Sequence, residues 1–437
     1  MMEKIVSLCK RKGFVYQGSE IYGGLAGTWD YGPLGVALKK NIESLWWRYF
    51  VDSRDDMYGI DSAILMNSKV WEASGHVSGF SDPLVQCAKC KRRFRADHLT
   101  DTAKCPECGG ALSEPRQFNM MFKTSVGSVD GSDTTVYLRP ETAQGMFVNF
   151  KNIIDSYHPK LPFGIAQIGR SFRNEIAPRD FIFRVRELEI MEFEYFLEEK
   201  SWEERFEYWL SQMRGWFKLL GFAEADIREI EIPDGERAHY SKRTVDFHFN
   251  YPHKFDEIGG LAYRTDFDLK NHIEHSGTDL AYMDPNTNEK FVPHVLEPTF
   301  GLGRHLLAVL VKAYTEDELG GEKRVYLKFP PRLAPIKAAV FPLLKNKPEL
   351  VAKAREIYTN LKKEIPQIMW DDNGNVGKRY RRQDEIGTPY CITVDFDTLG
   401  EIPEMTDTVT VRDRDDGEQE RVAIAGLAAY LQKKIKG

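Results

Sequence analysis

Four of the six cysteines have the spacing of a metal site. Cys87 and Cys90 form one C-x-x-C pair, and Cys105 and Cys108 form a second pair after a spacer of 14 residues. Two such pairs can close around one ion and complete a tetrahedral thiolate site of the kind that holds structural zinc. Four thiolates leave no open coordination position, so this zinc would fold a module and would not catalyse. Two chance pairs or a disulfide cluster are the alternatives, and the second is disfavoured in a chain without an export signal.

Arginines in two segments have the chemistry to hold a polyphosphate, because a guanidinium fork pairs bidentately with phosphate oxygens. The first segment, Phe172 to Glu189, contains Arg173 and Arg184. The second, Glu297 to Arg304, contains two glycines that would let a ligand approach the backbone closely. The sequence has neither a G-x-x-x-x-G-K-[ST] loop nor a G-x-G-x-x-G after a strand, which disfavours the usual nucleotide-binding folds. For any single arginine, the alternative is a solvated ion pair.

Apolar periodicity predicts the elements that position these arginines. Ile165 to Phe172 is expected to be a strand and Phe183 to Leu197 a longer one, preceded by a helix over Thr142 to Tyr157. Ser201, with Glu204 three residues on, predicts a capping box that opens the next helix. Helices and strands alternate over residues 114–330, so this part of the chain contains both kinds of element.

Domain boundaries follow from breaks in this pattern. The stretch from Lys328 to Pro335 is rich in proline and is the strongest break. We therefore expect a catalytic domain over residues 1–330, a zinc-ribbon insertion over 86–113 within it, and an α/β domain over 331–437.

Composition places the 437-residue chain among ordinary globular proteins, with a net charge of −6 and a mean hydropathy of −0.45. No membrane partner is expected, because no apolar run approaches the ~20 residues of a span. The first residues have no apolar signal segment, so a cytoplasmic location is expected.

Residues 335–437 carry 17 basic and 17 acidic side chains. Their basic charge is therefore local, in the cluster from Lys378 to Arg382. Composition alone indicates a solvated loop there, whereas the interleaved arginine and tyrosine suit stacking on unpaired RNA bases.

Further stretches narrow the interpretation to one family. They are Ser74 to His76, Arg139 to Gly145, Arg264 to Leu269 and Glu297 to Gly301. The two arginine segments resemble motifs 2 and 3 of class II aminoacyl-tRNA synthetases. With them, the further stretches resemble the glycyl-tRNA synthetases of the single-chain, homodimeric type. The resemblance extends over essentially the whole chain. It implies an α+β fold with a class II antiparallel sheet flanked by helices and a C-terminal α/β anticodon-binding domain. It also implies ligation of glycine to tRNA-Gly with ATP, Mg²⁺ and structural Zn²⁺.

The resemblance also implies roles for the arginine segments. Arg173 would contact the α-phosphate, Glu175 the adenine amino group, and Arg304 the adenine ring and γ-phosphate, so these three are the expected catalytic residues. Glu257 would bind magnesium. The complete set of implied ATP contacts is Arg173, Asn174, Glu175, Phe183, Arg184, Val185, Arg186, Glu187, Leu188, Glu257, Ile258, Gly301, Leu302, Gly303 and Arg304.

Glycine offers no side chain to recognise, so its ammonium group must be held by carboxylates in a partly dry pocket. The candidates are Glu141, Glu192 and Glu297, with Thr299 as a hydroxyl partner. A bulge near Met191 would keep Glu189 on the same face as Glu192, whereas Glu194 is expected on a solvated strand face. The implied amino-acid contacts are Arg95, Glu141, Leu188, Glu189, Ile190, Met191, Glu192, Arg264, Glu297, Pro298, Thr299, Phe300 and Gly301.

Two departures from the family pattern accompany these matches. Leu188 replaces the usual aromatic residue against adenine, and the usual motif 1 proline is missing near residues 66–68. Two other functions stay open at this point. One is a non-catalytic nucleic-acid-binding relative on the same fold, and the other is a synthetase for another small amino acid.

Overall fold

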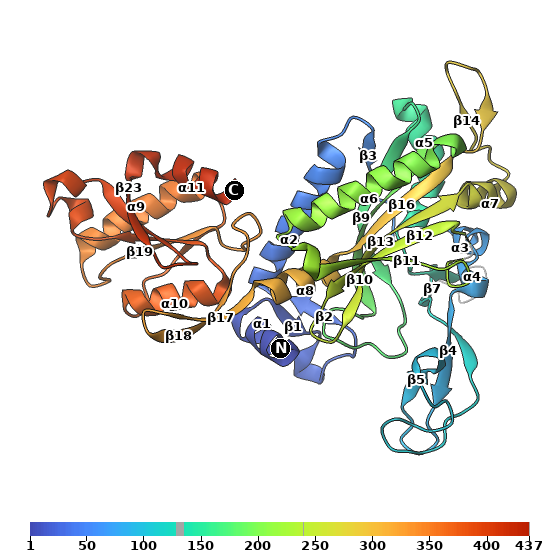
Figure 1. Ribbon diagram of the computed structural model, residues 1–437, viewed down its shortest axis with the longest axis horizontal. Helices are drawn as coiled ribbons and strands as arrows, with labels where there is room; N and C mark the ends of the chain where they lie inside the picture. The colour runs from blue at the N-terminus through green and yellow to red at the C-terminus, as the bar shows by residue number, and fades with distance from the viewer. Residues whose placement is uncertain (128–134, 239, 437) are drawn as a thin grey trace.

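The computed structural model describes residues 1–127, 135–238 and 240–436. A seven-stranded sheet, in the order β11-β12-β13-β16-β10-β9-β3, forms the centre of the larger part of these residues (Figure 1). Neighbouring strands in it are antiparallel, except that β3 runs parallel to β9. The strands are β3 (Met57–Gly59), β9 (Phe163–Phe172), β10 (Glu187–Leu197), β11 (Ile227–Glu231), β12 (Arg243–Asn250), β13 (Phe255–Thr265) and β16 (His294–Gly301). The expected antiparallel α+β core is confirmed.

Helices cover the two faces of this sheet unequally. The helices in this part of the structure are α1 (Met2–Lys12), α2 (Pro33–Trp47), α3 (Ser68–Ala73), α4 (His76–Gly79), α5 (Ala143–Tyr157), α6 (Trp202–Leu219), α7 (Phe267–Ser276) and α8 (Leu302–Ala313). The C-terminal residues form α9 (Pro348–Glu364), α10 (Val376–Ile386) and α11 (Leu427–Lys436). Residues of α2, α6 and α8 share one large core cluster with side chains such as Phe193 and Phe247 from the sheet. On the opposite face, α5 and α7 form a smaller cluster with Ile165 and Phe196. The smaller cluster leaves the rest of that face free for polar side chains.

Shorter strands complete the larger part of the structure. Strands β4, β5 and β6 form a small sheet beside the cysteines, and the other short strands form two-stranded pairs. They are β1 (Val15–Gln17), β2 (Trp29–Tyr31), β4 (Ser81–Gln86), β5 (Arg93–Arg95), β6 (Arg116–Asn119), β7 (Lys123–Ser125), β8 (Thr135–Tyr137), β14 (Tyr282–Met283), β15 (Lys290–Phe291), β17 (Tyr314–Leu319) and β18 (Glu322–Leu327).

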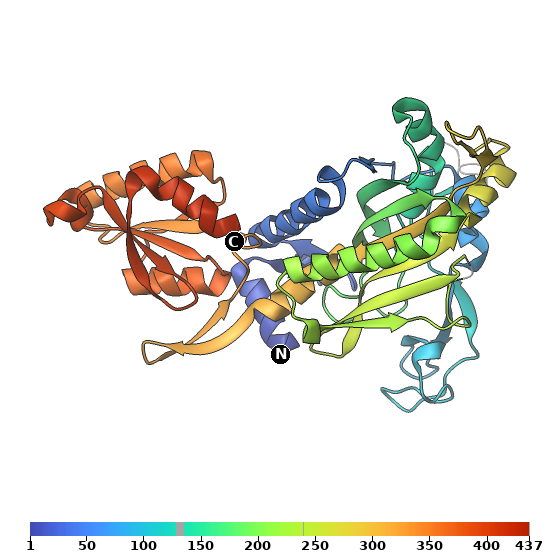
Figure 2. The ribbon, with the colours of Figure 1, turned by 45° about the horizontal axis from the view of Figure 1, so that its top comes forward.

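The C-terminal residues form a separate lobe, which the turned view in Figure 2 shows well apart from the large sheet. Its sheet has the order β20-β19-β21-β22-β23, with β19 parallel to both of its neighbours and the other pairs antiparallel. The strands are β19 (Ala338–Pro342), β20 (Ile368–Trp370), β21 (Tyr390–Val394), β22 (Thr408–Asp413) and β23 (Gln419–Ala423). Buried Arg324 of β18 joins the lobe to the larger part through an ion pair with Asp384 of α10, at 3.1 Å. Within the described residues, no helix is long and apolar enough to cross a membrane.

Three local expectations are wrong. The long strand begins at Glu187 and not at Phe183, because the chain turns at Asp180 and Phe181, whose φ angles are +59° and +60°. The Ser201 hydroxyl donates to the carbonyl of Glu198 and does not cap α6, so no capping box forms there. The third wrong expectation is the bulge near Met191. Strand β10 pairs with β9 in unbroken register from Glu187 to Phe196, so no bulge forms there.

Candidate active site

The open face of the sheet carries a row of polar positions across five strands. Glu192 of β10 lies opposite Gln167 of β9 on one side and Thr299 of β16 on the other. Thr299 in turn lies opposite Gly260 of β13, which lies opposite Asp246 of β12. Directly opposed residues share a face, so these five form one line. A Cβ on Gly260 would lie 2.9 Å from Oδ1 of Asp246, so glycine keeps the floor open there.

Arg264, with 1% of its surface exposed, organises the buried end of the site. Its Nε and Nη2 donate to the two oxygens of Asp268, both at 2.8 Å, and its Nη1 donates to Oε1 of Glu297 at 2.8 Å. The guanidinium also lies 3.9 Å from the ring centroid of Tyr240. The two bonds to Asp268 fix the orientation of that carboxylate, because a bidentate guanidinium fork allows one orientation of its partner. The single bond to Glu297 holds the second carboxylate beside it.

Glu141 is held in place beside this group. Its Oε2 lies 3.3 Å from Nε2 of His76, and its Oε1 accepts from Nε2 of Gln144 at 3.0 Å. Nδ1 of His76 contacts the hydroxyl of Ser74 at 2.8 Å, which orients the ring. Burial opposes ionisation of Glu141, but the charge and hydrogen bond of His76, with the charge of Arg264, lower its pKa overall. Glu141 therefore stays ionised near neutral pH.

Glu192 lies between two hydroxyl groups. It accepts from the backbone N–H of Thr142 at 3.1 Å, from the hydroxyl of Thr142, and from the hydroxyl of Thr299 at 3.3 Å. Burial raises the pKa of Glu192, and the charge of Glu141 adds to this effect. Glu194, two residues on, was expected to be solvated and is instead 0% exposed, because the α5 cluster closes over this end of β10.

A cavity of about 380 Å³ opens above this floor. Its polar lining converges on a space that suits a small, positively charged ligand, because most of its acidic side chains are partly or wholly buried. The lining residues are Glu141, Arg173, Ile190, Glu192, Ile232, Glu236, Arg237, Ala238, Tyr240, Thr244, Asp246, Glu257, Gly260, Leu261, Ala262, Glu297 and Thr299.

A second cavity, of about 520 Å³, adjoins the first. Arg173 lines both of them, so its guanidinium lies where they meet. Its Nε donates to the carbonyl of Pro140 at 3.0 Å, which fixes the side chain. Predicted ATP contacts that line the second cavity are Arg173, Glu175, Phe183, Arg184, Val185, Glu187, Leu188, Gly301, Gly303 and Arg304.

Arg304 and Glu257 face each other at the edge of these cavities. Nη1 of Arg304 lies 2.9 Å from Oε2 of Glu257, and the charge of Arg304 lowers the pKa of that carboxyl. The guanidinium of Arg304 lies 4.6 Å from the ring centroid of Phe183. Phe183 thus supplies an aromatic surface in the cavity that Leu188 also lines.

Several predicted contacts lie away from the two cavities or on their margins. Because the bulge is absent, Glu189 faces the opposite side of the sheet from Glu192. Its Oε1 accepts from Nζ of Lys39 at 2.7 Å, and both side chains line the larger cavity. Arg95 pairs with Asp82 at 2.7 Å beside the cysteine module. Met191, Ile258, Pro298, Phe300 and Leu302 are buried; Asn174 and Arg186 line a separate small cavity.

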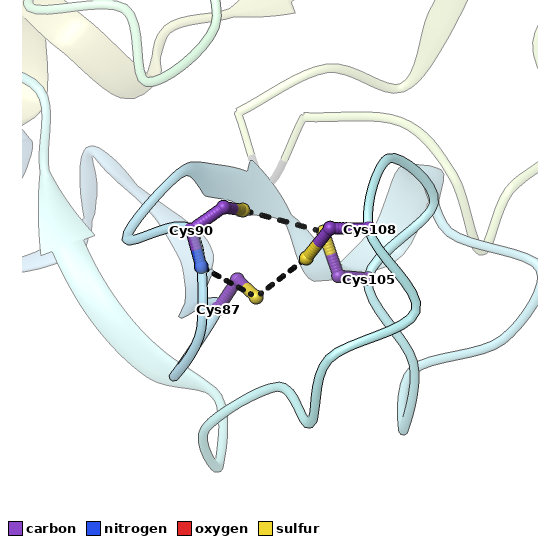
Figure 3. A group of neighbouring side chains, drawn as sticks. All are labelled: Cys87, Cys90, Cys105 and Cys108. Atoms are coloured by element: carbon purple, nitrogen blue, oxygen red, sulfur yellow. Dashed lines mark hydrogen bonds between the residues drawn. The ribbon is translucent and has the colours of Figure 1, made fainter.

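The four cysteines of the two C-x-x-C pairs converge, as Figure 3 shows. Sγ of Cys87 lies 3.5 Å from that of Cys108, Sγ of Cys90 lies 3.7 Å from that of Cys105, and all four sulfurs lie within 4.8 Å of one another. A tetrahedron with Zn–S bonds of about 2.3 Å has edges of about 3.8 Å, whereas a disulfide bond is about 2.05 Å long. All four are free thiols. The arrangement is compatible with one zinc ion.

Comparison with known proteins matches both parts of the chain. Residues 122–313 match the family model of the tRNA synthetase class II core domain (G, H, P, S and T), and residues 337–434 match that of the anticodon binding domain. The glycine–tRNA ligase of Clostridium acetobutylicum is 50% identical, covering 100% of this chain and 99% of the relative. Those of Caldanaerobacter subterraneus subsp. tengcongensis and Thermobifida fusca are each 48% identical, covering 100% of this chain and 98% of each relative. The chain belongs to the glycine–tRNA ligase family.

The basic cluster of the C-terminal lobe has a different environment from the one its composition indicates. It lies on α10, where Arg379 is 1% exposed and donates to the backbone carbonyls of Asp372 and Gly374. Arg382 pairs with Asp371 at 2.8 Å. In this family member, therefore, part of the cluster stabilises the lobe, and Arg379 is not available for stacking on RNA.

Sequence reasoning assigned no role to three residues of the candidate site. His76 contacts Glu141, and Asp246 and Tyr240 line the smaller cavity. A signal existed for Asp246, since the apolar residues Val245, Phe247 and Phe249 alternate with polar ones and put Asp246 on the opposite face. No spacing signal marks Tyr240, which reaches the site from a loop.

Proposed function

We propose that this chain activates glycine with ATP to form glycyl-adenylate and transfers glycine to the 3′ end of tRNA-Gly. The observation that carries the proposal is that the two cavities meet at Arg173. The smaller, acidic cavity suits the ammonium group of an amino acid, and the larger suits a nucleotide. The α-phosphate and the amino-acid carboxylate would then meet beside one guanidinium.

The chain's own residues supply positioning and charge. A carboxylate oxygen of glycine attacks the α-phosphorus, and the bond to the pyrophosphate leaving group breaks. Arg173 stabilises the negative charge that develops on the phosphoryl oxygens. Glu141, Glu192 and Glu297 hold the ammonium group, which fixes the direction of attack.

Magnesium fits at Glu257, whose carboxylate is 44% exposed beside Arg304, because Mg²⁺ takes oxygen ligands from one or two carboxylates and the substrate phosphates. When bound, Mg²⁺ would neutralise phosphate charge. Phe183 and Leu188 would hold the adenine ring.

Pyrophosphate exchange with an amino-acid panel tests the activity. We expect exchange of label between pyrophosphate and ATP that depends on glycine, with alanine and serine slower by orders of magnitude. Alanine adds one methyl group, and each carboxylate around the ammonium group is anchored, so the pocket cannot easily widen. A comparable rate with alanine or serine would point to a different amino acid. A lack of exchange with every amino acid would point to a non-catalytic relative.

Zinc in the cysteine module is a second proposal, resting on the sulfur geometry. We expect Cys105→Ser to lower bound zinc from one ion per chain to near zero and to expose residues 86–113 to proteolysis, because zinc binding supplies the folding free energy of such modules. Metal analysis and limited digestion measure both effects. The matched change Cys391→Ser, in the C-terminal lobe, should leave zinc content unchanged. Full zinc occupancy in Cys105→Ser would contradict the proposal.

The remaining expectations concern organisation. We propose a catalytic domain over 1–330 containing a zinc ribbon over 86–113, an anticodon-binding domain over 331–437, and a cytoplasmic homodimer. Ile21 and Tyr22, 89% and 86% exposed, are apolar surface that a second copy would cover. Sedimentation of a monomer at micromolar concentration would contradict the dimer.

The cytoplasmic location agrees with the free thiols, because a reducing compartment keeps cysteines unpaired. A disulfide in freshly isolated protein would count against that location.

A further inference from the structure

More negative charge surrounds Arg264 than nearby cations can balance. Five carboxyl groups with little or no exposure lie there: Glu141, Glu192, Glu194, Asp268 and Glu297. The titratable and charged groups that face them are Arg264, Arg139, Arg173, His76, His272 and Tyr240, so five carboxyl groups face three arginines. Burial lowers the pKa of His272, so this side chain is neutral near pH 7. Uncompensated charge is costly inside a protein, so a proton or a bound cation must make up the difference.

Glu194 is where that proton fits best. Both of its oxygens are buried, and neither has a hydrogen-bond partner among the described residues. The register of β10 and β16 places Glu194 opposite Glu297. Arg264 donates to Oε1 of Glu297, which leaves Oε2 for another donor. An ionised Glu194 would have no donor, whereas a protonated one can donate to Glu297 across the strands.

The electrostatics agree with this geometry. Burial raises the pKa of Glu194 well above its usual range, and the charge of Glu297 adds to the effect. Burial likewise raises the pKa of Glu297, to about 8. Near pH 7 the pair therefore retains a proton.

We propose that Glu194 and Glu297 share a proton in the free protein and that the ammonium group of glycine displaces it to solvent. The inference rests on the proposed function. One positive charge enters the pocket as one leaves, so the net charge of the site does not change. Glu297 contacts the substrate, and Glu194 acts through Glu297 as a positioning residue.

A linked equilibrium follows from this exchange. The ammonium group lowers the pKa of the pair, so glycine binding near pH 7 should release about one proton. Affinity for glycine should then rise with pH between 6 and 8, by up to about tenfold per pH unit. It should level off once the pH exceeds the pKa at which the free pair loses that proton.

Titration calorimetry of the full chain with glycine tests the proposal. Measurements near pH 7 in two buffers of different ionisation enthalpy count the protons released. The variant Glu194→Gln keeps the shape and donates an amide N–H to Glu297, which lets Glu297 ionise in the free protein. We expect its proton release to fall to near zero and its affinity to lose most of its pH dependence. The control Glu204→Gln, on the exposed side of α6, should behave as wild type.

The outcomes separate this inference from the proposed function. Glycine binding without proton release by the wild-type chain overturns the inference and leaves the proposed function intact, and this result needs no variant to fold. Unchanged proton release in Glu194→Gln also overturns it, because a purely structural role for Glu194 would give that result. A wild-type chain with neither glycine binding nor glycine-dependent exchange would overturn both.

Discussion

Replacing Arg173 with alanine is expected to slow glycyl-adenylate formation by at least about a hundredfold, while zinc content and fold persist. Removing one preorganised donor at a developing oxyanion costs about 10²–10³ in kcat, and Arg173 carries a full charge. Its side chain lines both cavities, and its contacts with the fold are weak: one bond from Nε to the carbonyl of Pro140 and a guanidinium 5.5 Å from the ring centroid of Phe80. Glycine-dependent pyrophosphate exchange measures the effect.

Arg214→Ala is the matched control for that experiment. Arg214 lies on α6, is half exposed and pairs with Glu229 at 2.6 Å. Its removal also deletes one guanidinium, but far from the cavities, so exchange should stay close to wild type. If Arg173→Ala retained near wild-type exchange, Arg173 would not be the phosphate-binding arginine.

Replacing Arg264 with alanine is expected to lower the free energy of unfolding by about 3–5 kcal/mol and to abolish glycine activation. The change leaves Asp268 and Glu297 buried without their cation, and removing one partner of a buried pair costs about that much. The loss should be larger at pH 8 than at pH 5.5. The charge of Arg264 lowers the pKa of Glu297, so without it that pKa rises further. Protonation then neutralises Glu297 at low pH, and the destabilisation grows as pH rises. Urea unfolding at both pH values measures this.

Lys270→Ala tests the same spacing at the surface. Lys270 and Asp266 form an ion pair between residues four apart, the same spacing as in the pair of Arg264 and Asp268. The side chain of Lys270, however, is 60% exposed. Exposed pairs contribute about 0–1 kcal/mol, so this variant should unfold close to wild type at both pH values. If the two variants lost equal free energies of unfolding, the burial of Arg264 would not be what determines its contribution to stability.

Local pattern predicted much of the fold. The helix expected over 142–157 is present as Ala143–Tyr157, and the strand expected to end at Phe172 does end there. Hydrophobic periodicity reports which face of an element is buried, and that information is local. The strand start at Phe183 and the cap at Ser201 were wrong because positive φ angles and competing hydrogen bonds decide them, and neither leaves a periodic signal.

The same division applies to the site. By itself, the sequence determined the zinc-type cysteine spacing and the arginine segments, because ligand type and spacing are written along the chain. The sequence also contains the motifs of the family in their usual order. Only the tertiary structure decided which carboxylates meet. Glu189 and Glu194 have the same chemistry, yet one pairs with Lys39 on the far face and the other is buried beside Glu297. Strand register and the helix packed above set that difference, since both depend on contacts between residues far apart in sequence.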